Sequence, residues 1–380
     1  MSDFGIIVRA VGASTDLAPN LGPRARGLRA TQVLPGGCGM ATWRIFDSIR
    51  YPPPYLGIGY EVRLTDGAGV WWSGRMEDFR SDSGADGPFW DIAAYGWGVA
   101  GADDGIYTIK DLSNTATSTV VANGITDLMQ NIDIQTITAS GYTISAATAV
   151  SAKMLTGGAL FKLMGQFGNS SNSPMIWVAQ ARNNGDVEFF FKLRPTTTDI
   201  LGRRRDANPA PFGLVGRQLA NRVIAEYNSG ASTVTVEDTA LQTAWGFTRA
   251  KAIFVPEITQ PADATQIATS VLTDSKVARM GAVSAHYTFD ALFTDSNRRR
   301  VPPWRVQAGM LFQFADVSPA AKASGGLAYS NSMLIAGVEI DEDARTVVLA
   351  PESYDMTSEL AVARAMRLLE GRHTTARSAS

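Results

Sequence analysis

The feature that most constrains the fold is a two-residue period on both sides of Asp66-Gly67, in residues 60–79 (YEVRLTDGAGVWWSGRMEDF). Alternating apolar and polar residues are typical of β-strands, and Asp-Gly between two such runs is a strong hairpin signal. The sequence therefore predicts a hairpin with one buried face. Trp71 and Trp72 are adjacent, so their side chains point to opposite faces of the second strand. Burying both requires either a second layer of this chain or a neighbouring subunit on the other face.

Similar patterns predict further elements along the chain. Strands are expected at residues 89–95, 141–145, 175–193 (two strands joined at Asn184-Gly185), 221–238 (two strands around residues 228–230), 284–294, 304–315 and 333–350. Helices are expected near residues 115–131, 155–167, 262–272 with Pro261 at the start, and 358–370. Gly157 and Gly158 oppose the second helix, because a glycine inside a helix costs about 1 kcal/mol. The expected fold class is β-rich α+β, with a mixed α/β middle region and a C-terminal amphipathic helix.

The charge balance and the scarcity of metal ligands exclude several classes of protein. The 380 residues include 34 Lys+Arg and 36 Asp+Glu, a net charge of −2, whereas a chain that mainly binds nucleic acid or anionic membranes is usually basic. Cys38, His286 and His373 cannot supply the roughly four ligands of a structural zinc site, and a single cysteine forms no internal disulfide. We therefore expect no metal and no cofactor.

No targeting or membrane segment is expected either. The chain has no run of about 18 strongly apolar residues, the length that a membrane-spanning helix needs. The N-terminal sequence MSDFGIIVRAVGAS places an acidic residue before a short apolar run, unlike a secretion signal. These features predict synthesis and folding in a cytoplasm.

Motifs that carry chemistry are weak. Residues 96–101 fit G-x-G-x-x-G, but Asp103 and Asp104 follow where a helix N-terminus would receive a pyrophosphate, so we interpret this motif as a tight strand exit. Glu77 and Asp78 are adjacent on a strand and point to opposite faces, which is a poor arrangement for a pair of catalytic carboxylates. The sequence predicts no catalytic site.

Two arginine runs stand out in this nearly neutral chain: Arg203, Arg204 and Arg205, and Arg298, Arg299 and Arg300. Each run precedes a proline-bearing loop, DANPAP or VPP, which indicates an exposed connection. Nucleic-acid contact is an alternative, but no aromatic residues are interleaved for base stacking. A solvated loop or a salt-bridging interface patch is therefore the favoured interpretation.

The order of these segments resembles baseplate hub and tail-tip proteins of tailed bacteriophages. The resemblance rests on QVLPGGCGMATWRI, YEVRLTDGAGVWWSGRMEDF and WDIAAYGWGVAGADD, and later on residues 221–272, 304–317 and 333–352. Its markers are Gly59, Val62, Leu64, Asp66, Gly69, Trp72, Gly74, Gly96, Trp97 and Asp103, followed by Asn221, Val223, Tyr227, Asp238 and Gly246. Residues 111–200 match no motif of this kind.

The resemblance implies a homotrimer in which each subunit contributes two related β-barrel-like, tube-type domains to a pseudo-six-fold ring. On this basis residues 1–110 form a first barrel-like domain, 111–200 a mixed middle domain, 201–355 a second β-rich domain or a part that completes the first barrel, and 356–380 a helix and polar tail. Trp71, Trp72 and Trp97 are candidates for subunit contacts or internal packing, and the two arginine runs are candidates for interfaces away from the channel axis.

The function implied is that of a structural virion protein and not an enzyme. It would sit at the tail tip, join the tail tube to a tip, spike or fibre protein, and enclose a channel through which DNA passes without sequence-specific binding. It would be assembled in the host bacterial cytoplasm. Two alternatives remain: a tail-associated enzyme that degrades glycans with a carboxylate pair, and a receptor- or carbohydrate-binding tail module.

Overall fold

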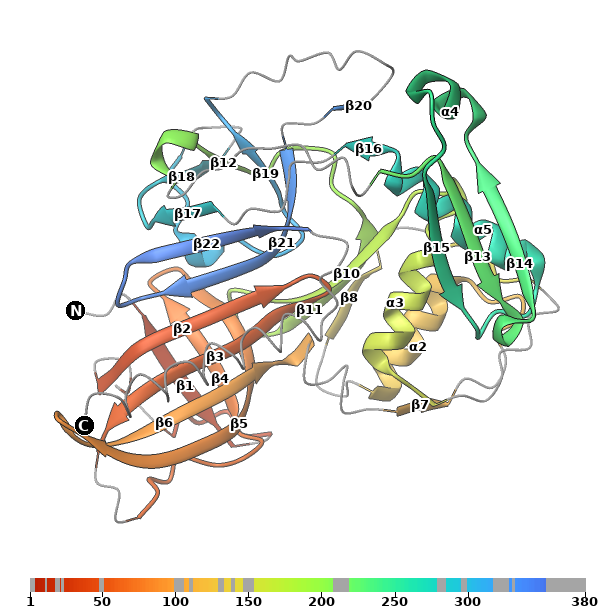
Figure 1. Cartoon of the computed structure of the whole chain (residues 1–380). Helices are drawn as coiled ribbons and strands as arrows, with labels where there is room; N and C mark the ends of the chain where they lie inside the picture. Colours follow the sequence, from red (N-terminus) through yellow and green to blue (C-terminus); the bar gives the residue numbers. More distant parts are fainter. Residues whose placement is uncertain are drawn as a thin grey trace.

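The computed structural model describes residues 4–10, 12–17, 21, 24–47, 51–98, 106–108, 112–128, 133–137, 141–145, 154–207, 219–278, 285–294, 299–316, 328–329 and 332–352. Strands dominate and helices are few, which confirms the β-rich α+β class (Figure 1). The helix expected at 358–370 lies outside the described residues, as do Asp103, Arg298 and His373. The expected domain limits remain predictions.

One large sheet joins strands from both ends of the described chain. Its main strands are β1 (Gly5–Arg9), β2 (Ala25–Val33), β3 (Gly36–Phe46), β4 (Glu61–Asp66), β5 (Gly69–Gly84), β6 (Gly87–Gly96), β12 (Ile200–Gly202), β18 (Leu292–Thr294), β19 (Leu311–Phe314) and β21 (Ser332–Asp341). In space their order is β1-β4-β5-β6-β3-β2-β21-β19-β12-β18. β2 pairs antiparallel with β21, with Ala30 opposite Ile340, so distant parts of the sequence share one sheet.

Further strands bring this sheet to 15 strands: β8 (Asp133–Ile137), β10 (Met175–Ala181), β11 (Val187–Leu193), β17 (Ala285–Thr288) and β22 (Thr346–Pro351). β10 lies parallel to β3, and β10 and β11 form the hairpin predicted around Asn184-Gly185. Over the described residues the main path ends at β1 and β18 without closing on itself. The expected pair of β-barrel-like domains is therefore not confirmed.

The β4–β5 hairpin forms around Asp66-Gly67 as predicted, with Leu64 opposite Trp72. The inward residues of both strands belong to a first core, which also receives side chains from β2, β3, β6, β17, β19, β21 and β22. Trp43, Tyr287 and Phe312 are among its fully buried members. This core thus depends on residues that are more than 200 positions apart in the sequence.

A second core forms beside the first, where helices meet a smaller sheet (Figure 1). Its elements are α2 (Thr117–Leu128), α3 (Gly157–Phe167), α5 (Pro261–Ser275) and the three-stranded sheet of β14 (Ser232–Glu237), β13 (Arg222–Tyr227) and β15 (Ala250–Val255), and β10 and β11 of the large sheet add Trp177, Phe189 and Phe191 to it. The three helices confirm the predictions near 115–131, 155–167 and 262–272. The glycines of α3 are tolerated because they occupy its first turn, after the N-cap Thr156 accepts a hydrogen bond from Ala159 N.

Some predicted strands are shorter than expected. In 304–315 only β19 is a strand, since residues Pro303–Arg305 form the 3₁₀ turn η5 and Gly309 adopts a φ of 89°. The stretch 284–294 is divided into β17 and β18, and 141–145 makes only isolated bridges. The remaining short elements are β7 (Ile106–Thr108), β9 (Met154–Thr156), β16 (Val277–Ala278), β20 (Ala328–Tyr329), η2 (Arg204–Asp206) and η4 (Asn228–Gly230), together with α4 (Thr239–Trp245), which was not predicted.

Candidate functional site

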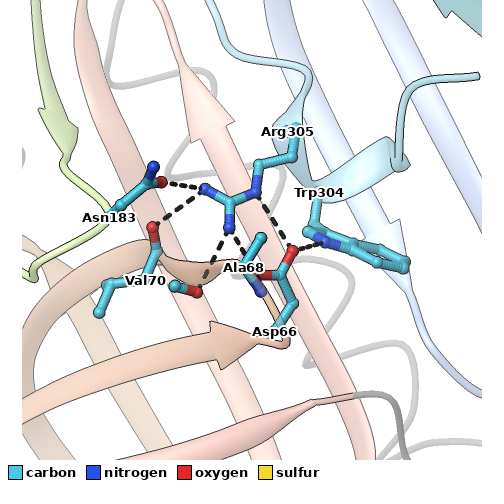
Figure 2. Close-up of polar contacts among 7 residues, drawn as sticks. Asp66, Ala68, Val70, Asn183, Trp304 and Arg305 are labelled. Atoms are coloured by element: carbon cyan, nitrogen blue, oxygen red, sulfur yellow. Dashed lines mark hydrogen bonds and ion pairs between the residues drawn. The ribbon is translucent and has the colours of Figure 1, made fainter. Parts of the chain in front are cut away.

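Asp66 lies at a polar junction of three chain segments: the β4–β5 turn, the β10–β11 turn and η5 (Figure 2). Arg305 donates to both carboxylate oxygens, from Nη2 to Oδ1 at 2.5 Å and from Nε to Oδ2 at 3.2 Å, and Trp304 Nε1 also donates to Oδ2. Arg305 Nη1 donates to Asn183 Oδ1 at 2.6 Å and to the Val70 carbonyl at 3.3 Å. One guanidinium therefore links all three segments.

The local backbone positions these groups. Ala68 N donates to Asp66 Oδ1 at 2.9 Å, which fixes the turn, and Val70 N donates to the Asn183 carbonyl at 3.0 Å. Gly69 has a φ of 133°, and a Cβ there would lie 2.7 Å from Asn183 O. Only glycine fits this close approach, because other residues rarely adopt that φ and would clash. The Asp-x-x-Gly spacing of the sequence thus builds the junction.

The Asp66 carboxylate is held in its ionised form. Its side chain is 8% exposed, against 23% for Arg305. Burial raises the pKa of Asp66, but the hydrogen bonds from Arg305, Trp304 and Ala68 outweigh burial and lower the pKa below its ordinary value. Since protein donors occupy both of its oxygens, this carboxylate is suited to joining segments and not to exchanging protons with a substrate.

A second buried cluster centres on Arg194, which follows β11. Its guanidinium makes a bidentate contact with Glu352, just after β22, and its Nε lies 3.4 Å from Asp274 of α5. Burial lowers the pKa of Arg194, but the carboxylates of Glu352 and Asp274 outweigh burial and raise it. The cluster connects the large sheet to the helix that packs on the small sheet.

A third cluster forms around Asp263, in the first turn of α5. Asp263 is fully buried and accepts hydrogen bonds from Tyr142 Oη at 3.1 Å, Ser145 N at 3.1 Å and Ser145 Oγ at 2.9 Å. Burial and the nearby Asp263 charge raise the pKa of Tyr142 to about 12, so its hydroxyl stays a donor at neutral pH. This cluster attaches residues 141–145 to α5. Like the other two clusters, it links elements of the fold.

The structure places the three candidate tryptophans inside the chain. Trp71 and Trp72 are both fully buried in the first core, and the Trp71 ring packs against Phe4 with centroids 5.5 Å apart. Trp97 is half-buried and donates from Nε1 to Ser73 Oγ at 3.1 Å. Both faces of β5 around Trp71 and Trp72 are therefore covered by this chain itself, and these two side chains offer no surface to a neighbouring subunit.

The arginine runs lie beside the same outer strand of the large sheet. Arg203, Arg204 and Arg205 follow β12, whose last residue, Gly202, pairs with Leu292 at the start of β18. The Arg299 carbonyl accepts a hydrogen bond from Thr294 N at the other end of β18, and Arg203, Arg205, Arg299 and Arg300 are exposed. Pairing of β12 with β18 thus places both runs at one edge of the sheet, although they are almost a hundred residues apart in the sequence.

The first two glycines of the G-x-G-x-x-G match have a packing explanation, and the third, Gly101, lies outside the described residues. A Cβ on Gly96 would lie 1.8 Å from Cys38 O, and a Cβ on Gly98 would lie 1.7 Å from Gly36 O. The backbone at the end of β6 therefore runs too close to β3 for any side chain.

Cys38 is buried in the first core, and burial raises the pKa of its thiol. His286 lies on β17 opposite Val348, on the exposed side of that strand.

The described residues contain neither a metal-binding cluster nor a membrane-spanning helix. No group of three or more His, Cys, Asp or Glu side chains there could hold a metal ion. No helix in the same ranges is long and apolar enough to cross a membrane.

The residues that form the three polar clusters were not predicted, apart from Asp66 as a turn residue. Arg305 lies 239 positions from Asp66, and Arg194 lies 158 positions from Glu352. No local pattern in a single sequence links residues so far apart. For Asp263, the acidic residue in the first turn after Pro261 signals a helix start, but the partners in residues 141–145 carry no matching signal.

The similarity of this chain to known proteins lies in its fold. No protein-family model matches the chain, and no curated protein matches it significantly. The fold is similar to the 43 kDa tail protein of prophage MuSo2 from Shewanella oneidensis, with a TM-score of 0.56 and 12% identity over 91% of this chain and 97% of that chain. It is equally similar to a tail protein from Neisseria meningitidis MC58, with a TM-score of 0.56 and 10% identity over 92% and 97% of the two chains.

Proposed function

We propose that this chain is a structural component of a phage-type tail and acts as a homotrimeric hub at the distal end of the tail. The observation that carries the proposal is the fold similarity to two tail proteins, which extends over 97% of each of those chains and over more than nine-tenths of this one. A similarity of that extent concerns the whole architecture and not one shared module. It agrees with the sequence resemblance to baseplate hub and tail-tip proteins.

The way the chain uses its polar residues supports a structural and non-enzymatic role. Asp66, Arg194 and Asp263 each hold together elements that are distant in the sequence. A hub has to keep its shape while a tube is attached above it and a spike or fibre below it. Hydrogen-bonded and ion-paired clusters between elements favour one rigid arrangement of those elements.

The proposal includes several finer points. The hub docks under a hexameric tail tube through two β-barrel-like, tube-type parts of each subunit, and it carries a tip, spike or fibre protein on its other side. It encloses a channel through which DNA leaves without sequence-specific contacts. The arginine runs face away from the channel, because a strongly basic wall would retain a polyanion. Assembly takes place in the host bacterial cytoplasm, and the mature location is the tail tip of the virion.

The test combines a mass measurement with imaging. The purified full-length chain is examined by size-exclusion chromatography with light scattering, and by negative-stain electron microscopy alone and with the tube protein of the same tail. We expect a mass of three chains and a ring that attaches to one end of the tube. A chain that stays monomeric at high concentration and does not attach to the tube contradicts the proposal.

A further inference from the structure

The small sheet carries an exposed lobe, residues 222–257, on the side of the molecule away from the large sheet (Figure 1). None of residues 228–254 is buried, although they form two strands and α4. One face of the sheet packs into the second core through β13 residues such as Val223 and Ala225. The other face, called here the outer face, is exposed over β14 and β15.

The outer face combines apolar side chains with one unpaired acid, Glu226. Register places Ile224 beside Ala252, and Glu226 beside Phe254, whose side chain is 61% exposed. Glu226 makes no ion pair with any described residue, whereas Arg222 on the same face is paired with Glu237 at 2.6 Å. An exposed aromatic residue beside an unpaired carboxylate is suited to a partner that is basic at the matching position.

The arginine patch, defined as Arg203, Arg205, Arg299 and Arg300, has the complementary charge. Arg203 and Arg299 make no ion pair with any described residue. Arg205 and Arg300 face Asp206 and Asp290 at 3.7 Å, and their side chains are 69% and 78% exposed. Pairs that long and exposed contribute little, so the guanidinium groups remain available to a partner.

The two surfaces lie on opposite sides of the molecule. In Figure 1, β12 and β18 lie at the upper left and the small sheet lies at the right. They cannot meet within one chain, but each can meet the other on a second copy. A contact between two different surfaces of identical chains is head-to-tail, and such a contact forms a closed ring when the rotation between copies fits.

We propose that the outer face, through Glu226 and Phe254, docks onto the arginine patch of a second copy of this chain. This inference rests on the proposed function, because it assigns the residues that hold the homotrimer together. The contact joins each copy to the next in a ring. Since opposite charges contribute to it, its strength decreases as the salt concentration rises.

The first experiment measures self-association of the full-length chain by sedimentation velocity over a range of concentrations. Glu226→Arg and Phe254→Ala are each expected to weaken association about 30-fold or more, as substitutions at interface hot spots do. Two matched controls change exposed residues on other surfaces: Asp86→Arg at the β5–β6 turn, and Ile58→Ala, whose side chain is 72% exposed. Association of the controls is expected to stay within about twofold of the wild type.

A charge exchange provides the decisive result. The Arg299→Glu/Arg300→Glu variant is expected to lose association. Adding Glu226→Arg to it is expected to raise the affinity of self-association at least tenfold above that of the variant without it, since acid and base have then changed places. Unchanged thermal unfolding shows that each variant is folded. If the wild type forms trimers and the variants do so equally well, this inference is wrong and the proposed function stands. If the wild type is monomeric throughout, both are wrong.

Discussion

At the scale of single residues, the Asp66 junction shows that one guanidinium can join separate chain segments by hydrogen bonds, without an extended packing surface between them. Arg305 donates to one carboxylate, one side-chain amide oxygen and backbone carbonyls, and these partners belong to two different turns (Figure 2). Each donor and acceptor is satisfied by a specific partner, so the loss of one partner leaves the others buried and incompletely bonded. That loss costs more than the removal of an exposed ion pair.

We therefore expect Arg305→Met to reduce the free energy of unfolding by about 3 kcal/mol, because Asp66 is left buried without its counter-charge. Urea-induced unfolding followed by tryptophan fluorescence measures the change. Arg24→Met serves as the matched control, since Arg24 forms an exposed pair with Asp47 outside the proposed docking surfaces and its loss is expected to change stability by about 0.5 kcal/mol or less. Equal effects of the two substitutions would show that the junction adds no stability.

The lowered pKa of Asp66 also predicts a dependence of stability on pH. A carboxyl with a lowered folded-state pKa contributes its full stability above its unfolded pKa, about 3.9, and this contribution is lost as the pH falls toward the folded value. Asp66→Asn has no such group, so the stability difference between wild type and variant should be constant from pH 7 to 5 and become smaller below about pH 4. Unfolding in urea at pH 7, 5 and 3 measures it. If the difference in free energy of unfolding between wild type and Asp66→Asn does not change with pH, the pKa of Asp66 is not lowered in the folded state.

At the scale of elements, the close approach of β6 to β3 depends on glycine. Gly96→Ala would place a Cβ 1.8 Å from the Cys38 carbonyl, and neither strand can move without breaking its own sheet hydrogen bonds. We expect a loss of about 3 kcal/mol in the free energy of unfolding, the upper range for overpacking. Gly67→Ala is the control, because no atom lies within 4 Å of its added Cβ and its φ is ordinary. The midpoint of thermal unfolding should be clearly lower for Gly96→Ala than for Gly67→Ala. Similar midpoints would show that the close approach of β6 to β3 does not require glycine at position 96.

Elements with a local signature were predictable, and their arrangement was not. The β4–β5 and β10–β11 hairpins followed from alternation and turn residues. α4 was missed because none of its residues is buried, so it has no apolar stripe; its N-cap Asp238 and its left-handed Gly246 were the available signals. The pairing of β2 with β21, and the three polar clusters, depend on contacts across most of the chain. A single sequence contains no local pattern for such contacts.

At the scale of the whole molecule, the Arg194 cluster connects the large sheet to the unit built from α5 and the small sheet. Glu352 follows β22 of the large sheet and Asp274 belongs to α5, so the guanidinium lies between the two cores. Removing it leaves buried Asp274 and partly buried Glu352 without their cation, and this loss opposes the contact between the cores. We therefore expect Arg194→Met to loosen the smaller unit before the rest of the chain.

Native-state hydrogen exchange measures this loosening. In Arg194→Met, amides of α5 and β13 should exchange through a local opening at least tenfold faster, while amides of β3 and β6 in the first core keep protection close to that of the wild type. Arg44→Met is the control, because its pair with Asp91 is exposed and lies outside the smaller unit and the proposed docking surfaces. Uniform acceleration over both cores would mean that the molecule opens only as one unit, and that the cluster stabilises the fold without connecting two separable parts.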